Sequence, residues 1–312
     1  MTSRAALVAV GGVVAVTVSL ATVAWAGGPH FSAWAPAQKI DEIAGNSAEV
    51  NTAALDGCPI ESPDGLSLYI ASNRPGGLGG IDIWVARRAS RAAPWGAPVN
   101  LGAPVNSAAN DFCPTPIHGG GLFFVSTRAG FCGSVANADI YFTRRNPAGG
   151  WSDPKHFACA PGGPNSTLDE MAPSYAQGRL YFSQSSASVA GELYVSRKRG
   201  SMSFGPARPI SELNDAAAND IQPNVRKDGR EIVFSSNRSG TLGGQDVWIA
   251  TRRSVAHRWL APVNLGSAVN TAAAETRPSF SWDAQMLYFG RAPGPEGSTD
   301  IFVSARQKNR KS

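Results

Sequence analysis

Short segments in which apolar and polar residues alternate recur along the chain. They are DIWVARR at Asp82, DIYFTRR at Asp139, ELYVSRK at Glu192, DVWIATRR at Asp246 and DIFVSAR at Asp300. Successive copies lie 57, 53, 54 and 54 residues apart. Alternation with a period of two is typical of a strand with one buried face, and a regular spacing indicates a repeated unit. The sequence therefore predicts five copies of one β unit.

Each copy shows signs of four strands. A second apolar segment, such as Leu68-Tyr-Ile-Ala, precedes each segment above, and turn residues such as Pro63-Asp-Gly65 stand before it. After each of the first four copies an aromatic residue opens a further segment, with an apolar residue six positions later, as in Trp95 and Leu101. Four antiparallel strands per unit form the blade of a β-propeller.

The two ends of the chain predict how the ring of blades closes. The fifth unit ends near Arg306 without its fourth segment, while FSAWAPAQKI near the start supplies one, with Trp34 and Ile40 six positions apart. Closure removes the exposed strand edges that would otherwise invite aggregation. We therefore expect an all-β, five-bladed propeller of four-stranded antiparallel blades, in which the N-terminal strand near Trp34 completes the last blade.

Composition agrees with this fold and excludes one class of partner. The 312 residues include 34 Gly and 22 Pro, and only 16% are charged, which suits short strands and turns. The net charge of +5 is carried in part by the tail from Arg306 to Lys311. Because no basic cluster stands elsewhere, the sequence predicts no nucleic-acid partner.

The N-terminus predicts export. Arg4 precedes an uncharged apolar stretch from Ala5 to Trp25, which closes with Ala24-Trp25-Ala26, the layout of a secretory signal. The predicted organisation is a signal peptide over 1–26, a propeller over 27–306 and a basic tail over 307–312. The location would be secreted, periplasmic or in the cell envelope. An uncleaved anchor is the alternative, and it would be the chain's one contact with a membrane.

Export changes the interpretation of the four cysteines. In an oxidising compartment they are expected to form disulfides, for which three pairings exist. The repeat alignment favours Cys58 with Cys113 and Cys132 with Cys159. The short C-x-x-C spacing of a zinc site is absent from the sequence.

The repeated motif resembles a known family. The run from Ser62-Pro63-Asp64-Gly65 to Trp84 is similar to the TolB-type propeller repeat, a distant relative of the WD-repeat family. The resemblance covers about Phe31 to Arg306 and implies an exported binding platform, often toward envelope proteins or the cell wall. The third unit departs from it, with Ser183-Gln-Ser185 in place of Ser-Asn-Arg.

The joins between blades hold the candidate ligand-binding residues. Each join has an asparagine, then an acid five or six positions later, and a proline three positions after the acid. Propeller topology brings these acids and the arginines of the Ser-Asn-Arg motif to one rim around the central tunnel. The predicted ligand-binding set is Asp56, Asp111, Glu170, Asp220, Glu275, Arg74, Arg128, Arg238 and Arg291.

A structural alternative stands beside this interpretation. A ring of exposed carboxylates would attract cations, but each acid could instead accept backbone N–H groups of its own turn or pair with a nearby arginine. Asp82 and its counterparts could cap their glycine bends. No cofactor is expected; the sequence GGLGGID resembles a calcium-binding repeat, but its Asp82 falls one position late.

These features favour a non-catalytic, exported module that binds an envelope or secreted protein or a cell-wall glycan. The alternative is a glycosidase-like hydrolase that uses two rim carboxylates as acid and base. A third possibility, a purely structural envelope protein, merges with the first until a ligand is known. We favour the binding module because the acids are near-equivalent copies and no motif of catalytic chemistry stands in the sequence.

Overall fold

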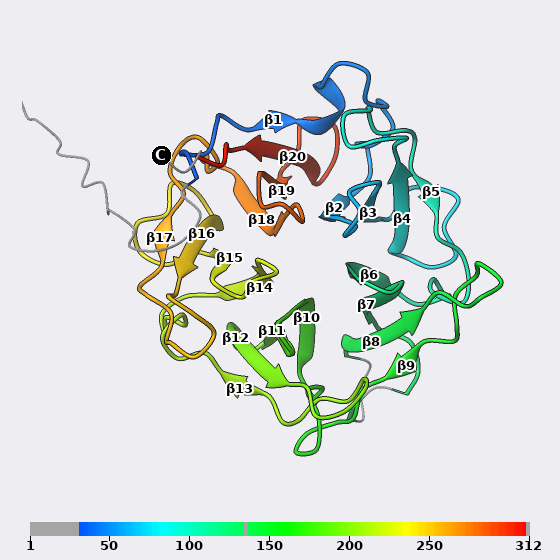
Figure 1. The fold of residues 1–312 in the computed structure, drawn as a ribbon, viewed down its shortest axis with the longest axis vertical. Coiled ribbons are helices and arrows are strands. Elements are labelled where there is room, and N and C mark those ends of the chain that lie inside the picture. The colour runs from blue at the N-terminus through cyan, green and yellow to red at the C-terminus, as the bar shows by residue number, and fades with distance from the viewer. Residues whose placement is uncertain (1–30, 131, 134–136, 310–312) are drawn as a thin grey trace, which may run out of the picture.

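The computed structural model describes residues 31–130, 132, 133 and 137–309. In this part of the chain twenty strands form five four-stranded sheets, which surround a central axis as propeller blades (Figure 1). The predicted fold is confirmed. The predicted signal peptide, 1–26, lies outside the described residues, as do the last three residues of the predicted tail. No helix in the described ranges is long and apolar enough to cross a bilayer.

The first four blades are each formed by consecutive strands, from the axis outward. Blade 1 contains β2 (Asp56–Glu61), β3 (Ser67–Ser72), β4 (Asp82–Arg87) and β5 (Val99–Asn100). Blade 2 contains β6 (Asp111–Ile117), β7 (Gly121–Ser126), β8 (Asp139–Arg144) and β9 (Lys155–His156). Blade 3 contains β10 (Asp169–Ala176), β11 (Arg179–Ser186), β12 (Val189–Arg197) and β13 (Arg208–Pro209). Blade 4 contains β14 (Asp220–Val225), β15 (Glu231–Ser236), β16 (Asp246–Thr251) and β17 (Val263–Asn264).

Blade 5 joins the two ends of the described chain. Its strands are β18 (Ala274–Phe280), β19 (Met286–Ala292), β20 (Asp300–Ala305) and β1 (Gln38–Lys39), which leads into the short 3-10 turn η1 (Ile40–Glu42). β1 pairs antiparallel with β20 on the outside of the blade (Figure 1). The predicted ring closure is confirmed.

Trp34 confirms the register of this closure. In three other blades an arginine at the end of the third strand stacks on the tryptophan that opens the fourth segment, with 4.0–4.1 Å from guanidinium carbon to ring centroid, as for Arg88 over Trp95. Arg306 stacks on Trp34 in the same way at 4.4 Å. Trp34 therefore occupies in blade 5 the place that Trp95 occupies in blade 1.

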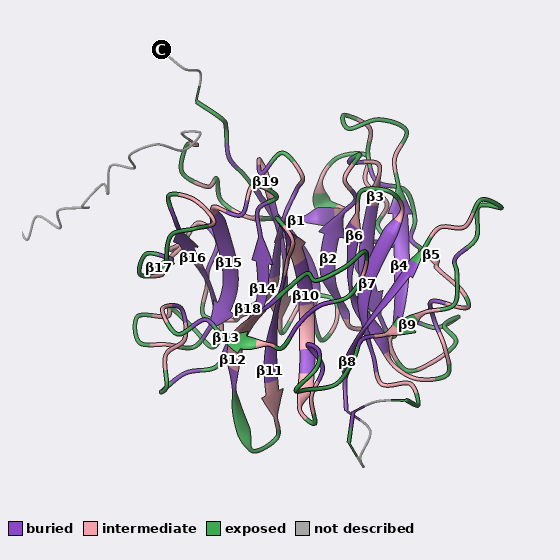
Figure 2. Ribbon diagram, turned by 60° about the horizontal axis from the view of Figure 1, so that its bottom comes forward, coloured by how far each residue is buried: buried purple, intermediate pink, exposed green. Residues whose placement is uncertain are grey.

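The core lies between the blades. Five apolar clusters each join two neighbouring blades, and they are built from the alternate residues of the second and third strands, such as Leu68, Phe124 and Phe234. Figure 2 shows the strands largely buried, while the loops at both ends are partly or fully exposed. Burial of apolar surface between sheets is the main stabilising term, so the alternation seen in the sequence sets the stacking of the blades.

Every inner strand carries a bulge at the same place. The register shifts between the second and fifth residues of the acid-led segment, as between Gly57 and Ile60. The residue after the shift begins is left-handed in all five blades, with φ from 46° to 58°, and a proline follows it. Proline in a sheet is tolerated at a bulge because no ladder hydrogen bond needs its missing N–H.

Polar side chains join the inner strands at four of the five junctions. Two hydroxyls donate to a proline carbonyl of the next blade: Thr115 to Pro173, and Ser279 to Pro59 at 2.5 Å. Two side chains accept a backbone N–H of the next blade: Ser174 from Val225 at 2.9 Å, and Asn224 from Phe280 at 3.1 Å. The counterpart in blade 1 is Ile60, which has no such group.

Both favoured disulfides are present. Cys58 pairs with Cys113 across the inner strands of blades 1 and 2, with 4.9 Å between Cα atoms. Cys132 pairs with Cys159, with 5.8 Å between Cα atoms, and ties the β7–β8 loop to the segment after β9. Two disulfides are typical of a protein from an oxidising compartment.

Candidate functional site

The five acids stand at the entrance of the inner strands, as predicted, but they are buried. All inner strands run from one end of the tunnel, here called the rim, to the opposite hairpin face, where the turns between first and second strands lie. None of the five acids has any exposed surface: Asp56, Asp111, Glu170, Asp220 and Glu275. Each accepts the N–H of the residue after its join asparagine, for example Ser107 N–H to Asp111 at 2.7 Å.

Three of the acids are aspartates, and each pairs with an arginine two residues beyond its cross-strand partner. Arg74 donates to Asp56 at 2.5 Å and Arg128 to Asp111 at 2.6 Å, and Arg238 donates to Asp220. The serine directly opposite each aspartate accepts from the arginine Nε at 2.9 Å. The serine thus holds the guanidinium in place while a terminal nitrogen of the arginine bonds the short aspartate side chain directly.

The other two acids are glutamates, and their partners stand directly opposite in the strand register. Arg291 donates its Nε to Glu275 at 2.7 Å, and Gln184 donates to Glu170 at 2.9 Å. The longer glutamate side chain reaches its cross-strand partner directly, and no serine takes part in the contact. With no cation here, burial raises the pKa of Glu170 to about 8 against the hydrogen bonds from Ser166.

These contacts agree with the structural alternative, in which each acid accepts backbone N–H groups of its own turn or pairs with a nearby arginine. The acids and arginines are brought together as the sequence indicated, but the carboxylates hold the joins rather than face the solvent. A ligand at the rim would have to displace these contacts to reach any carboxylate. A direct ligand role for the nine residues stays a prediction.

Two other repeated side chains also serve the joins. The join asparagine bonds both backbone groups of one residue on the third strand, as Asn106 does with Ile83 at 2.9 Å each way, and the pattern recurs in all five blades. The aspartate that opens a third strand accepts N–H groups of its own preceding bend, as Asp246 does from Leu242 at 2.7 Å. The glycine-bend aspartates are thus used as caps.

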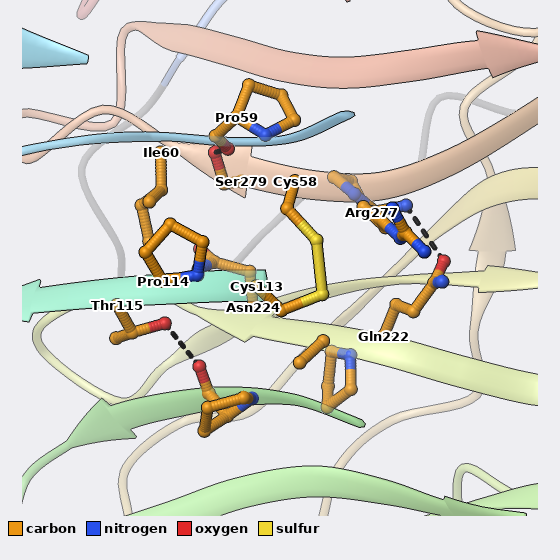
Figure 3. Close-up of a pocket in the computed structure, with 14 residues that line it drawn as sticks. Cys58, Pro59, Ile60, Cys113, Pro114, Thr115, Gln222, Asn224, Arg277 and Ser279 are labelled. Atoms are coloured by element: carbon orange, nitrogen blue, oxygen red, sulfur yellow. Dashed lines mark hydrogen bonds between the residues drawn. A yellow bond between two sulfur atoms is a disulfide. The ribbon is translucent and has the colours of Figure 1, made fainter. Parts of the chain in front are cut away.

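The tunnel wall is where the blades differ. It is lined by the left-handed residue and the proline of each bulge, together with the polar junction residues. The left-handed residue changes from blade to blade: Cys58, Cys113, Ala172, Gln222 and Arg277. Figure 3 shows the disulfide crossing the tunnel wall and Arg277 facing Gln222, whose Oε1 accepts the backbone N–H of Arg277 at 3.0 Å.

Arg277 is the charged member of this ring. Among the described residues it makes no ion pair, and its Nε has no hydrogen-bond partner. Loss of hydration lowers the pKa of Arg277 to about 10, so the guanidinium is still charged at neutral pH. The lining of this part of the tunnel contains no carboxylate.

Side chains of different blades meet at the hairpin end of the tunnel. His118 and Trp282 belong to blades that are not neighbours, yet their rings contact edge to face with 4.5 Å between centroids. The ammonium group of Lys227 lies 5.4 Å from the centre of the Trp282 ring. These side chains narrow the tunnel at the hairpin face.

A second cavity lies on the hairpin face between blades 1 and 5, with a volume of about 470 Å³. Glu61 is almost fully buried in its wall and accepts 3.0 Å hydrogen bonds from Tyr288 and from Arg88. Burial raises the pKa of Glu61 despite these two partners. Asp283, more exposed at the same cavity, has its pKa lowered because hydrogen bonds from Ser281 and Gln285 outweigh its partial burial.

One group of metal-binding residue types occurs among the described residues. It consists of Cys132, His156 and Cys159, whose potential ligand atoms lie within 4.8 Å of one another. Both sulfurs are joined in the disulfide, and the His156 Nε2 lies 2.6 Å from a carboxylate oxygen of Asp139. The oxidised pair leaves no thiolate to act as a ligand.

Arg277, Gln222 and Glu61 are not among the residues predicted from the sequence. A signal for them is present, because an alignment of the five inner strands shows one glutamine and one arginine at the second position after the acid and one glutamate at the fifth. The predicted set rests on positions that repeat in every blade, and these three residues do not repeat.

No protein-family profile matches the chain, and no curated protein matches it in sequence. Solved structures match it in fold. One is an α-L-arabinofuranosidase from Lactobacillus brevis, with a TM-score of 0.51 and 13% identity over 80% of this chain and 90% of that one. A protein of unknown function from Dyadobacter fermentans has a TM-score of 0.52 and 11% identity over 88% of this chain and 100% of that one.

TolB from Acinetobacter baumannii is also similar, with a TM-score of 0.49 and 14% identity. That match covers 83% of this chain and 56% of the TolB chain, so the chain spans little more than half of the length of that structure. At such identities the matches show the propeller fold alone. Because this fold occurs both in glycoside hydrolases and in other proteins, it does not decide the function.

Proposed function

We propose that this chain is an exported, non-catalytic propeller that binds an envelope protein or a cell-wall ligand through the rim end of its tunnel. The observation that carries the proposal is the tunnel wall, which offers Arg277 and Gln222 and, among the described lining residues, no carboxylate. Hydrolysis of a glycoside by two rim acids requires one proton donor and one base beside the substrate. The five rim acids are buried and bonded to other groups.

Export is supported by the two disulfides and by the signal-like N-terminal sequence. A ligand in the same compartment would be an envelope or secreted protein or cell-wall material. The rim end suits recognition because the symmetric scaffold beneath it is rigid and the residues that differ between blades face one axis.

Site-specific photo-crosslinking tests this proposal. A benzoyl-phenylalanine at Ala272, an exposed residue of the join before β18 at the rim, is compared with one at Ala256, an exposed residue of the loop after β16 at the hairpin face. We expect an adduct with an envelope or cell-wall component in intact cells at position 272 and none at 256. Equal labelling at both positions, or none at either, would count against a site at the rim end of the tunnel.

A second candidate function has one observation in its favour. Glu61 and Asp283 line the same cavity of about 470 Å³, and their pKa values are shifted in opposite directions. Two carboxyls whose environments separate their pKa values are the usual acid and base of a glycosidase. Under this alternative Glu61 is the proton donor and Asp283 the base, in place of the predicted rim acids.

An activity assay separates the two functions. Purified protein is tested on a panel of chromogenic aryl glycosides, with Glu61→Gln as the active-site variant and Glu49→Gln, an exposed acid, as the control. The hydrolase alternative requires turnover by the wild-type protein and a loss of about 100-fold or more in Glu61→Gln. Turnover that Glu61→Gln leaves unchanged excludes this pair.

A further inference from the structure

The backbone of Arg277 is fixed by the bulge and by a contact with the neighbouring blade. Its φ of 55° puts the residue in the left-handed region, within the bulge of β18, and its N–H is bound by Gln222 of the neighbouring blade. A Cβ on Gly57 would lie 3.1 Å from a terminal nitrogen of the Arg277 guanidinium. The counterparts of Gly57 in the other blades are larger: Phe112, Met171, Ile221 and Thr276. Glycine at this one position leaves room for the guanidinium.

The charge of Arg277 has no compensation in the described part of the protein. The nearest acid in sequence, Glu275, is bound by Arg291 and by Thr271. A partly buried cation without a counter-ion costs free energy unless an anion or water occupies its free donors. The amide nitrogen of Gln222 also has no hydrogen bond within the described chain, so a second donor accompanies the guanidinium.

The space beside Arg277 limits the size of the anion. The open volume is about 30 Å³, and one water molecule needs roughly 10–15 Å³ of such space. That is room for about two oxygen atoms, the size of a carboxylate. The prolines, such as Pro59 and Pro223, follow the left-handed residues in strands that run away from the rim, so they give the pocket an apolar wall on its hairpin side.

We propose that this pocket binds the carboxylate at the end of a peptide chain that enters from the rim. The guanidinium of Arg277 pairs with the two carboxylate oxygens, the geometry that arginine favours, and the Gln222 amide donates a further hydrogen bond. The chain behind the carboxylate leaves the pocket toward the rim, away from the five prolines. This inference rests on the proposed function, since it names the group that the rim end recognises.

The test uses the purified, folded chain and three short probes. They are N-acetyl-alanyl-alanine with a free carboxylate, the same dipeptide as its amide, and N-acetyl-aspartyl-alanine amide, whose one carboxylate is on a side chain. Affinity is measured by calorimetry for the wild-type protein, Arg277→Gln, Arg277→Lys and Arg208→Gln. Arg208 is exposed on β13 and serves as the matched control.

The expected result is binding of the free acid alone, weakened about tenfold or more in Arg277→Gln, weakened less in Arg277→Lys and unchanged in Arg208→Gln. Equal affinity for the acid and the amide, an unchanged Arg277→Gln, or no binding of the acid up to ~10 mM would overturn the inference. Stronger binding of the side-chain carboxylate would overturn the assignment to a chain end. Thermal unfolding of each variant confirms that it is folded.

The same variants separate this inference from the proposed function. If Arg277→Gln still forms the adduct through a crosslinker at position 272, the propeller binds its ligand without the carboxylate contact, and only the inference fails. If the protein with Arg277 intact forms no adduct at position 272, the proposed function fails.

Discussion

The disulfide between Cys58 and Cys113 joins blades 1 and 2 at the one inner junction where no polar side chain does so. At the other four junctions a threonine, serine or asparagine bonds the neighbouring inner strand, and Ile60 takes that place in blade 1. A covalent link thus stands where the repeated hydrogen bond is missing. It lies on the tunnel wall beside Arg277, so it also shapes the proposed pocket.

Replacing both cysteines should destabilise the ring at this junction. We expect Cys58→Ala with Cys113→Ala to lower the free energy of unfolding by about 2–4 kcal/mol. Adding Ile60→Thr should recover part of the loss, because a threonine there can donate to the carbonyl of Pro114 as Thr115 does to that of Pro173. Denaturant unfolding measures both effects. If Ile60→Thr destabilises the double variant further, the two kinds of junction are not equivalent.

The buried pair of Asp111 and Arg128 should stabilise the join between blades 1 and 2. Asp111→Asn leaves the guanidinium without its counter-ion, and we expect a loss of about 3 kcal/mol in the free energy of unfolding. The double variant with Arg128→Leu should lose less than the sum of the single variants, since the pair is removed together. Additive losses would show that the two side chains act independently.

Glu170 should make stability depend on pH. Its pKa is raised in the folded protein from its ordinary 4.5 to about 8, so the folded state holds a proton that the unfolded state has lost between these values. The free energy of unfolding therefore falls as the pH rises from about 4.5 to about 8. In Glu170→Gln this part of the fall should be absent. Parallel pH profiles of the wild-type protein and the variant would contradict the assignment.

Gln184→Arg should give blade 3 the contact between arginine and glutamate that blade 5 has. Gln184 stands opposite Glu170 in the register in which Arg291 stands opposite Glu275. The new cation should lower the pKa of Glu170 and raise the stability more at pH 8 than at pH 5. Combining the change with Glu170→Gln should remove the gain. A gain of equal size in the presence of either side chain would indicate an effect that does not involve the carboxyl.

Most of the architecture follows from the sequence because it depends on local, repeated signals. The alternation in DIWVARR, the turn residues and the orphan segment at Trp34 predict the blades, their number and the closure. The exposure of the rim acids does not follow from such signals. Whether Asp111 faces solvent depends on where Arg128 and the N–H of Ser107 lie once two blades are packed together.

The candidate site residues could not be predicted from the sequence for a related reason. Arg277 and Glu61 each occur in one blade, so repetition gives them no weight, and what marks them is the absence of a counter-ion or the burial of a carboxyl. The burial of Glu61 and the surroundings of Arg277 both depend on residues that other blades bring near in the folded ring. The volume of the tunnel likewise depends on the bulge that turns five left-handed residues toward one axis.

The most direct test of a ligand site in the tunnel is to fill it. Ala172→Phe places a ring on the tunnel wall, and Ala256→Phe places the same ring on the exposed loop of the hairpin face. With the component crosslinked at position 272 in hand, its dissociation constant is measured for both variants and for the wild-type protein. A folded Ala172→Phe that binds at least about tenfold more weakly, beside an unchanged Ala256→Phe, is the predicted result. Equal affinity in all three proteins would contradict it.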